Sequence, residues 1–138
     1  MYVSPCGWFC IDEPSNWNLR EHKDAIDLTS HFDNTQIKIT SARKNSIIDE
    51  HEVLLIHERW LGETGYIEQE STLESYTPEV YSYRTIAGDA QRIRILQHIF
   101  WSHYLVLFEL SVPIDDLLQK NISDYQELVD TIEPLTVD

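Results

Sequence analysis

The most apolar stretch of the chain, HYLVLFELSV at residues 103–112, has the composition of a central β-strand. A strand that is covered on both faces of its sheet is a nearly continuous hydrophobic run rather than an alternating one. Pro113 follows directly and ends the run, because proline has no N–H for the next ladder hydrogen bond. The stretch therefore predicts a sheet that has other elements packed on both faces.

Shorter runs elsewhere in the chain have the features of further strands. Residues 25–30 and 36–41 alternate apolar and polar side chains, and Asp33-Asn34 between them favours a turn, so we expect a hairpin. The remaining expectations are strands at residues 7–12, 66–68, 80–86 and 90–100, a loop at residues 71–78, and a two-residue turn at Gly88-Asp89.

Two segments have helical periodicity. The first is expected to begin at a capping box at residues 46–49 and to end at Gly62. The second is expected to begin at a capping box at residues 123–126 and to run to about Ile132. Six or seven strands joined mostly by short turns, with two helices, predict a single α+β domain over residues 1–138. In it, helices pack on the faces of a mostly antiparallel central sheet, as in an α/β/α sandwich.

A Pro-x-x-Trp turn, Pro14-Ser15-Asn16-Trp17, follows the strand-like segment Phe9-Cys10-Ile11. A strand pair, a mid-chain helix, an antiparallel meander and a closing helix come after it, up to Leu135. This order resembles the small α/β/α sandwich that PsbP and the Ran-binding Mog proteins share, many bacterial examples of which are stand-alone domains. The resemblance implies a binding role rather than catalysis, and it transfers no functional residue because no site motif matches.

The charge balance is strongly acidic, with 10 Lys and Arg against 24 Asp and Glu and a net charge of −14. Such a surface repels phosphates, so we expect neither nucleic-acid binding nor attachment to anionic membranes. Nine of the acids and a single base, Arg59, fall between residues 45 and 80. This segment predicts an acidic surface for a protein partner with a basic surface, as in an adaptor or an immunity-type inhibitor; the alternative is that the acids serve solubility alone. The candidate contact residues are Asp49, Glu50, Glu52, Glu63, Glu68, Glu70, Glu74 and Glu79.

A second function is suggested by three of the few basic residues, which fall on neighbouring predicted strands. Arg92 and Arg94 share a strand face by period two, and with Arg84 they could hold a carboxylate or phosphate. Tyr81 and Tyr83 are the candidate aromatic walls of such an anion or small-molecule site. The competing interpretation is that these arginines pair with the chain's own acids.

Catalytic and metal-binding motifs are not evident in the sequence. The third functional candidate, a hydrolase, has no G-x-S-x-G motif to support it, and no partner can be assigned to Cys10. His51 and His57 lie six residues apart, which on a helix separates them by roughly 120° and prevents them from sharing a metal ion. We therefore expect no cofactor and no metal.

The strands on either side of Trp101-Ser102 are expected to form a hairpin with this pair as its loop, flanked by His98 and His103, which we expect to be structural. That register would place Arg94 opposite Glu109, the one acid within the apolar strand. A buried carboxylate without a partner costs several kcal/mol, so one expectation is an Arg94–Glu109 ion pair. The other is that Glu109 lies near the strand end and points to solvent.

The beginning of the chain lacks the basic segment and long apolar run of a signal peptide, so a cytoplasmic location is expected. If their segment is a strand, Cys6 and Cys10 lie about 13 Å apart, too far for a disulfide, and we expect two ordinary buried thiols.

Overall fold

The computed structural model describes residues 1–15, 17–23, 25–31, 33–65, 67–77, 80–88, 91–114 and 118–135, and of residues 67–77 and Leu118 it describes only the backbone. Seven strands form one fully antiparallel sheet, in the spatial order β3-β4-β5-β9-β8-β7-β6. Their bounds are β3 Trp17–Glu21, β4 Ala25–Ser30, β5 Gln36–Arg43, β6 Ile67–Thr77, β7 Val80–Gly88, β8 Arg92–Trp101 and β9 Tyr104–Pro113.

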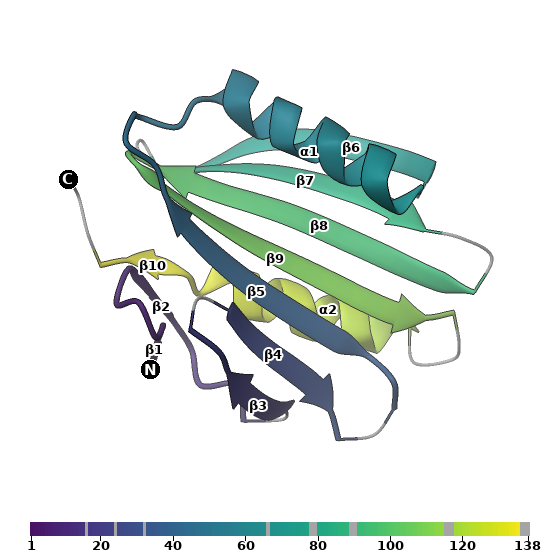
Figure 1. Cartoon of the computed structure of the whole chain (residues 1–138). Coiled ribbons are helices and arrows are strands. Elements are labelled where there is room, and N and C mark those ends of the chain that lie inside the picture. The colour runs from purple at the N-terminus through teal and green to yellow at the C-terminus, as the bar shows by residue number, and fades with distance from the viewer. Residues whose placement is uncertain are drawn as a thin grey trace.

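The two helices lie on opposite faces of this sheet, α1 (Glu50–Thr64) over the β6–β8 side and α2 (Leu118–Asp130) behind it (Figure 1). A second, three-stranded sheet consists of β1 (Tyr2–Val3), β2 (Phe9–Ile11) and β10 (Glu133–Pro134), with β2 in the middle. The predicted α+β class, with an antiparallel central sheet and helices on its faces, is confirmed.

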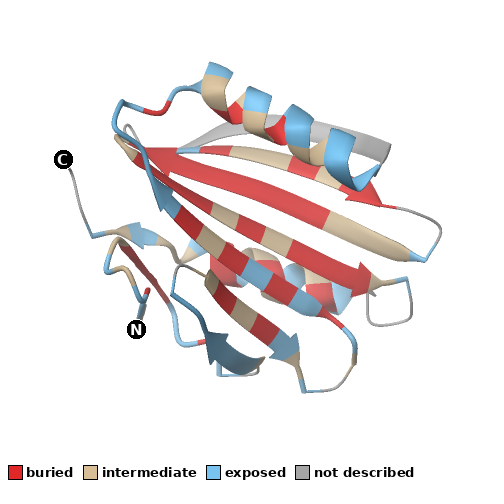
Figure 2. Cartoon of the chain, in the orientation of Figure 1, coloured by how far each residue is buried: buried red, intermediate tan, exposed pale blue. Residues whose placement is uncertain are grey.

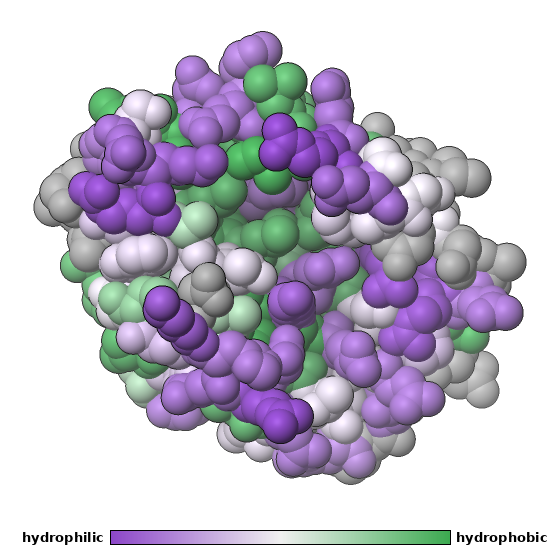
Figure 3. Space-filling view, in the orientation of Figure 1, coloured by the Kyte–Doolittle hydropathy of each residue, from purple (hydrophilic) through white to green (hydrophobic). Residues whose placement is uncertain are grey.

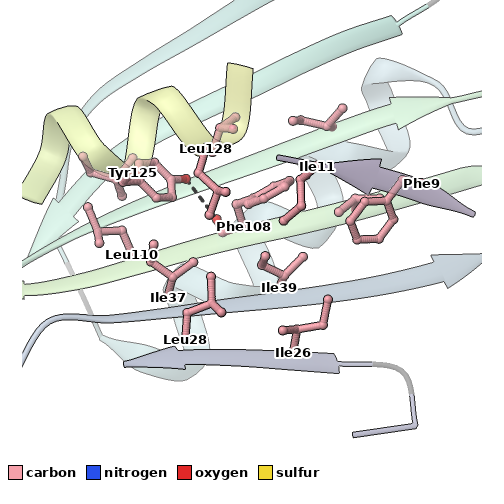
Figure 4. Close-up of a cluster of buried hydrophobic side chains, with 14 of the residues drawn as sticks. Phe9, Ile11, Ile26, Leu28, Ile37, Ile39, Phe108, Leu110, Tyr125 and Leu128 are labelled. Atoms are coloured by element: carbon pink, nitrogen blue, oxygen red, sulfur yellow. Dashed lines mark hydrogen bonds between the residues drawn. The ribbon is translucent and has the colours of Figure 1, made fainter. Parts of the chain in front are cut away.

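The apolar stretch that predicted a central strand is β9, the middle strand of the seven. On its α2 side, Phe108 and Leu110 are fully buried against Tyr125 and Leu128 (Figure 4). The Tyr125 hydroxyl donates a hydrogen bond to the Phe108 carbonyl oxygen over 3.4 Å. The same core takes in Phe9 of the small sheet, so both sheets and α2 share one hydrophobic interior.

The predicted hairpin is confirmed as β4 and β5, which pair Leu28 with Ile37 and Ile26 with Ile39. These four side chains are buried, as the alternation of apolar and polar residues predicted. Trp17 N–H donates to the Pro14 carbonyl over 3.2 Å, a hydrogen bond that fits the turn expected there. Trp17 then begins β3, an edge strand that the sequence did not predict.

Helix α1 begins and ends three residues or fewer from where its caps were expected. Asp49, rather than Ser46, is the N-cap, and its carboxylate accepts a hydrogen bond from Glu52 N–H over 2.9 Å. The helix passes through Gly62 and stops at Gly65, whose φ of 72° is left-handed and whose N–H reaches the Leu61 carbonyl. Glycine adopts this conformation without steric cost, so Gly65 can terminate the helix.

The capping role of Asp49 gives a first prediction. Asp49→Ala should lower the free energy of unfolding by about 1 kcal/mol, because Glu52 N–H loses its acceptor and the helix dipole loses a carboxylate. Asp49→Asn should retain most of the stability, since the amide oxygen can accept the same bond. Urea denaturation checks both values, and equal losses in the two variants would contradict the capping role.

Three other expectations were wrong. The expected loop at residues 71–78 belongs, up to Thr77, to the 11-residue strand β6, nine residues of which pair with β7 along the sheet edge. Pro78 lies outside the described residues. The expected two-residue turn at Gly88-Asp89 does not fit the register, because β7 ends at Gly88, which pairs with Ile93, and β8 begins only at Arg92. Asp89 itself lies outside the described residues. Helix α2 begins at Leu118 instead of at a capping box at residues 123–126.

The segment before α1 is fastened to the β8–β9 turn, which positions the helix. Lys44 N–H donates to the His103 carbonyl and Ile48 N–H to the Ser102 carbonyl, both over 2.8 Å. Val53 of α1 then packs, completely buried, against Phe100 of β8. Most of the outward surface of α1 is exposed, whereas β8 is buried along most of its length (Figure 2).

Candidate functional site

The acidic segment predicted from the sequence maps to α1 and β6. β6 is an edge strand of the large sheet, and α1 covers the half of the sheet that ends at this edge (Figure 1). Glu50, Glu58 and Glu63 are exposed on α1. Two other acids have structural contacts, because Asp49 caps α1 and Glu52 lies 3.6 Å from the Lys44 ammonium group. Glu68, Glu70 and Glu74 belong to the described backbone of β6, and Glu79 lies outside the described residues.

A hollow of about 340 Å³ opens at the beginning of α1, and we call it the Tyr81 hollow. It is lined by Ile48, Asp49, Glu50, Tyr81 and Phe100. The Tyr81 ring stacks on the Phe100 ring with their centroids 5.6 Å apart. Because Ile48 and Phe100 line this hollow beside Asp49 and Glu50, the acidic segment adjoins an apolar depression. The face seen in Figure 3 is largely hydrophilic, and hydrophobic atoms are visible at the bottom of a separate hollowed part near the middle of the view.

A second hollow, of about 470 Å³, lies beside α2, and we call it the Trp17 hollow. Its lining is Asp12, Glu13, Pro14, Ser15, Trp17, Asp124, Glu127, Leu128, Asp130 and Thr131. Five of these residues are carboxylic acids, and none of these lining residues is Lys or Arg. Asp12 N–H donates to the Thr131 hydroxyl over 3.0 Å, which joins the two walls.

The sequence analysis missed the Trp17 hollow because its walls come from segments more than 100 residues apart. One signal was present: Asp124, Glu127 and Asp130 recur every three residues, which places carboxylates along one side of a helix. The Pro-x-x-Trp turn was noticed as a mark of the fold, and its Trp17 is the aromatic wall of this hollow.

The structure does not bring the predicted Arg/Tyr site together. Arg84 pairs with Gln97, whereas Tyr83 pairs with His98, so Arg84 points to the opposite sheet face from Tyr83. Arg92 and Arg94 do share the face of Tyr81 and Tyr83, as expected. Arg92, however, lies at the far end of β8 from the residue that pairs with Tyr81, about 26 Å along the strand.

Arg92 is also engaged within the protein. Its Nε donates to the Ser111 hydroxyl over 2.8 Å, and its Nη2 donates to the carbonyl oxygens of Asn34 and Ser111 over 2.9 and 3.2 Å. These bonds occupy the Nε and Nη2 donors of the guanidinium group, which a bidentate contact with an anion would need.

The predicted opposition of Arg94 and Glu109 was wrong by two residues of register. The β8–β9 loop is Ser102-His103, with Ser102 in a left-handed conformation at φ 49°, and Trp101 pairs with Tyr104. Ser111 consequently faces Arg94, and Lys38 of β5 faces the half-buried Glu109.

Arg94 and Glu109 still line one hollow of about 360 Å³ on the open half of this face. Arg20, Asp27 and Lys38 line it with them, so positive and negative groups alternate there. This mixture does not favour a ligand of either sign.

Two histidines are buried where α1 meets the sheet. His57 of α1 lies with its Nε2 3.2 Å from the Thr85 hydroxyl, and its ring lies 6.1 Å from that of His98 on β8. His98 is 1% exposed, and neither of its ring nitrogens has a hydrogen-bond partner among the described residues. Burial, followed by the neighbouring His57, lowers the pKa of His98 to about 3, so the ring is neutral at physiological pH.

The other predicted chemical groups are accounted for as follows. His51 is exposed while His57 is buried, so they lie on different sides of α1, as their spacing predicted. Cys6 and Cys10 are free; Cys10 is buried as expected, whereas Cys6 is only half-buried, and burial raises the pKa of the Cys10 thiol. Within the described ranges, no three His, Cys, Asp or Glu side chains are grouped to hold a metal ion. The described helices include none with the length and apolarity to cross a bilayer.

Comparison with known proteins identifies the fold. No protein-family model and no curated protein sequence matches the chain significantly. The chain is similar to the solution structure of the cyanobacterial PsbP protein CyanoP from Synechocystis, with a TM-score of 0.72 and 12% identity over 96% of this chain and 90% of that one. A crystal structure from Bacteroides thetaiotaomicron has a TM-score of 0.48 and 13% identity, over 96% of this chain and 47% of that one. The predicted resemblance is thus confirmed at the level of architecture: the chain has a PsbP-like fold.

Proposed function

We propose that the protein is a non-catalytic binding module that recognises the basic surface of a partner protein. The observation that supports this proposal best is the Trp17 hollow, in which five carboxylates and an indole ring line about 470 Å³. A lysine or arginine side chain is the protein group that such a lining fits.

The chemistry of the lining favours a guanidinium or ammonium group. Carboxylates form charge-assisted hydrogen bonds with such cations, and a tryptophan face attracts them through its quadrupole. Two of the acids already have cationic neighbours, since Lys120 Nζ lies 2.7 Å from Asp124 and the terminal amino group 3.6 Å from Glu13. Among the described residues, no Lys or Arg is paired with Asp12, Glu127 or Asp130, so the hollow keeps an excess of negative charge.

The acids of α1 and β6 have a different part in this proposal. They add to a net charge of −14, which raises the rate of encounter with a basic partner through long-range attraction. Screening by salt acts mainly on this long-range term, whereas a desolvated contact in the hollow is less sensitive to it.

An oligo-arginine peptide tests the proposal directly. A fluorescein-labelled octa-arginine should bind at low salt with a Kd measurable by fluorescence anisotropy, and Trp17→Ala should weaken binding about five- to tenfold. Because Trp17 also packs against the core, Glu127→Lys at the exposed rim of the hollow serves as a second variant with the same expected direction.

The matched control is Glu63→Lys, the same charge reversal on the exposed surface of α1. It should weaken binding less than Glu127→Lys, and the difference should persist when the salt concentration is raised to about 0.3 M. Equal effects of the two reversals would remove the hollow from the proposal. An absence of peptide binding at low salt would contradict the function itself.

A further inference from the structure

The Tyr81 hollow is formed where three parts of the chain meet at one end of the sheet. Ile48 precedes α1, Tyr81 lies near the beginning of β7, and Phe100 lies near the end of β8. The hollow encloses about 340 Å³, room for one large apolar side chain with part of its backbone.

The floor of this hollow is apolar, and some of its apolar surface reaches solvent. Ile48 and Phe100 are 4% and 3% exposed, whereas the Tyr81 ring stacked on Phe100 is 42% exposed. Ile47, which precedes Ile48 in the chain, is 70% exposed. An exposed aromatic ring over a buried apolar floor is typical of a protein contact surface, where such groups anchor a partner.

The rim of the hollow is negatively charged. Asp49 and Glu50 are both exposed, and Asp49 is held in place by its bond to Glu52 N–H. The nearby ammonium group of Lys44 is engaged with Glu52 on the first turn of α1, and no described Lys or Arg is paired with Glu50. The local field therefore favours a cation beside the apolar floor.

We propose that this hollow binds a segment of the partner protein that presents an aliphatic or aromatic side chain next to a lysine or arginine. The apolar side chain enters between Tyr81 and Ile48, and the basic side chain meets Glu50 at the rim. A second copy of this chain is a poor occupant because two molecules of net charge −14 repel each other, and an anionic lipid headgroup is repelled in the same way. The inference rests on the proposed function and adds the kind of sequence that the partner presents.

The test is a titration of the isotopically labelled protein with the peptide Gly-Ser-Lys-Phe-Lys-Ser-Gly, followed by amide chemical shifts. We expect the largest shifts at Ile48, Glu50, Tyr81 and Phe100. The same peptide with serine in place of phenylalanine should produce much smaller shifts there, and a version with glutamate in place of both lysines should produce none.

Two pairs of variants distinguish binding in the Tyr81 hollow from nonspecific electrostatic attraction between the basic peptide and the acidic protein. Tyr81→Ser should weaken peptide binding about fivefold or more, while Leu55→Ser, which removes an exposed apolar side chain of α1 outside the hollow, should not. Glu50→Lys should weaken it more than Glu58→Lys, the same reversal farther along α1.

Each result has a distinct meaning. Shifts confined to the Trp17 hollow, or equal effects within either variant pair, would overturn this inference and leave the proposed function intact. No shift at any site, together with no binding of octa-arginine, would overturn both.

Discussion

Lowering the pH from 8 to 4 should reduce the free energy of unfolding by about 3 kcal/mol through His98 alone. The folded-state pKa of about 3 lies below the ordinary value of 6.5, so the unfolded chain takes up a proton in this range and the folded chain does not. The contribution is therefore fully present above pH 6.5 and is lost as the pH falls toward 3. Urea denaturation at a series of pH values measures it.

The surroundings of His98 explain the size of this effect. Its neighbours include the His57 ring 6.1 Å away and Tyr83 and Leu107, which pair with it on the adjacent strands. Among the described residues, no carboxylate forms an ion pair with His98, so an imidazolium there would be buried and uncompensated.

His98→Leu should remove this part of the pH dependence, leaving an unfolding free energy that falls less steeply between pH 7 and pH 4. His51→Gln is the matched control, since His51 is exposed on α1 and its loss should leave the profile unchanged. If His98→Leu retained the slope of the original protein, the buried neutral imidazole would not be its source.

Asn121→Leu should lower the free energy of unfolding by about 2–3 kcal/mol, because the change leaves buried polar groups without a donor. The Asn121 amide donates to the Asp33 carboxylate and to the Thr35 hydroxyl, each over 2.9 Å, and Thr35 is fully buried. Asp33 also accepts from Thr35 N–H over 2.8 Å. These bonds connect α2 with the loop between β4 and β5.

The same network predicts a change in titration. Burial by itself would raise the pKa of Asp33, but hydrogen bonds from Thr35, Asn121 and Ser30 outweigh it and lower the pKa below its ordinary value. In Asn121→Leu the pKa of Asp33 should rise toward its ordinary value, so Asp33 should contribute less of the stability that the original protein loses as the pH falls below about 4. Carboxyl chemical shifts followed against pH measure this difference.

Gln119→Leu, on the exposed side of α2, is the control for placing leucine in this helix. The double variant with Asp33→Ala should lose less than the sum of the two single losses, because both remove the same bond. A change of less than about 0.5 kcal/mol in Asn121→Leu would show that the network does not stabilise the fold.

Much of the architecture follows from local patterns. The run at residues 103–112 and the alternation at residues 25–30 and 36–41 predicted β9 and the β4–β5 hairpin because their burial is decided by the period of their own side chains. The second segment with helical periodicity predicted the later part of α2 for the same reason.

The failures occurred where a distant segment decides the outcome. β6 has a polar sequence, and it is a strand because β7 offers it a pairing edge. Gly62 and Gly65 both suit a helix end, and only the hydrogen bond to Leu61 selects the second. The β8–β9 loop depends on the left-handed Ser102, for which the sequence carries no glycine signal.

The candidate sites show the same division. The acids between residues 45 and 80 could be assigned to α1 in part, because helix periodicity is local. The separation of Arg84 from Arg94 required the register of β7 and β8, and the Trp17 hollow required the packing of α2 against residues near the beginning of the chain.

The partner of β5 inside the sheet has a consequence for biosynthesis. β5 pairs with β9 from Arg43 opposite Tyr104 to Gln36 opposite Ser111, a separation of more than 60 residues. At a translation rate of roughly 5–20 residues per second, the nascent chain carries the β4–β5 hairpin for several seconds before the strand that completes it leaves the ribosome. During that interval Ile37 and Ile39 belong to a strand with an unpaired edge. When the protein is expressed in large amounts, we therefore expect it to depend on chaperones that shield hydrophobic strands.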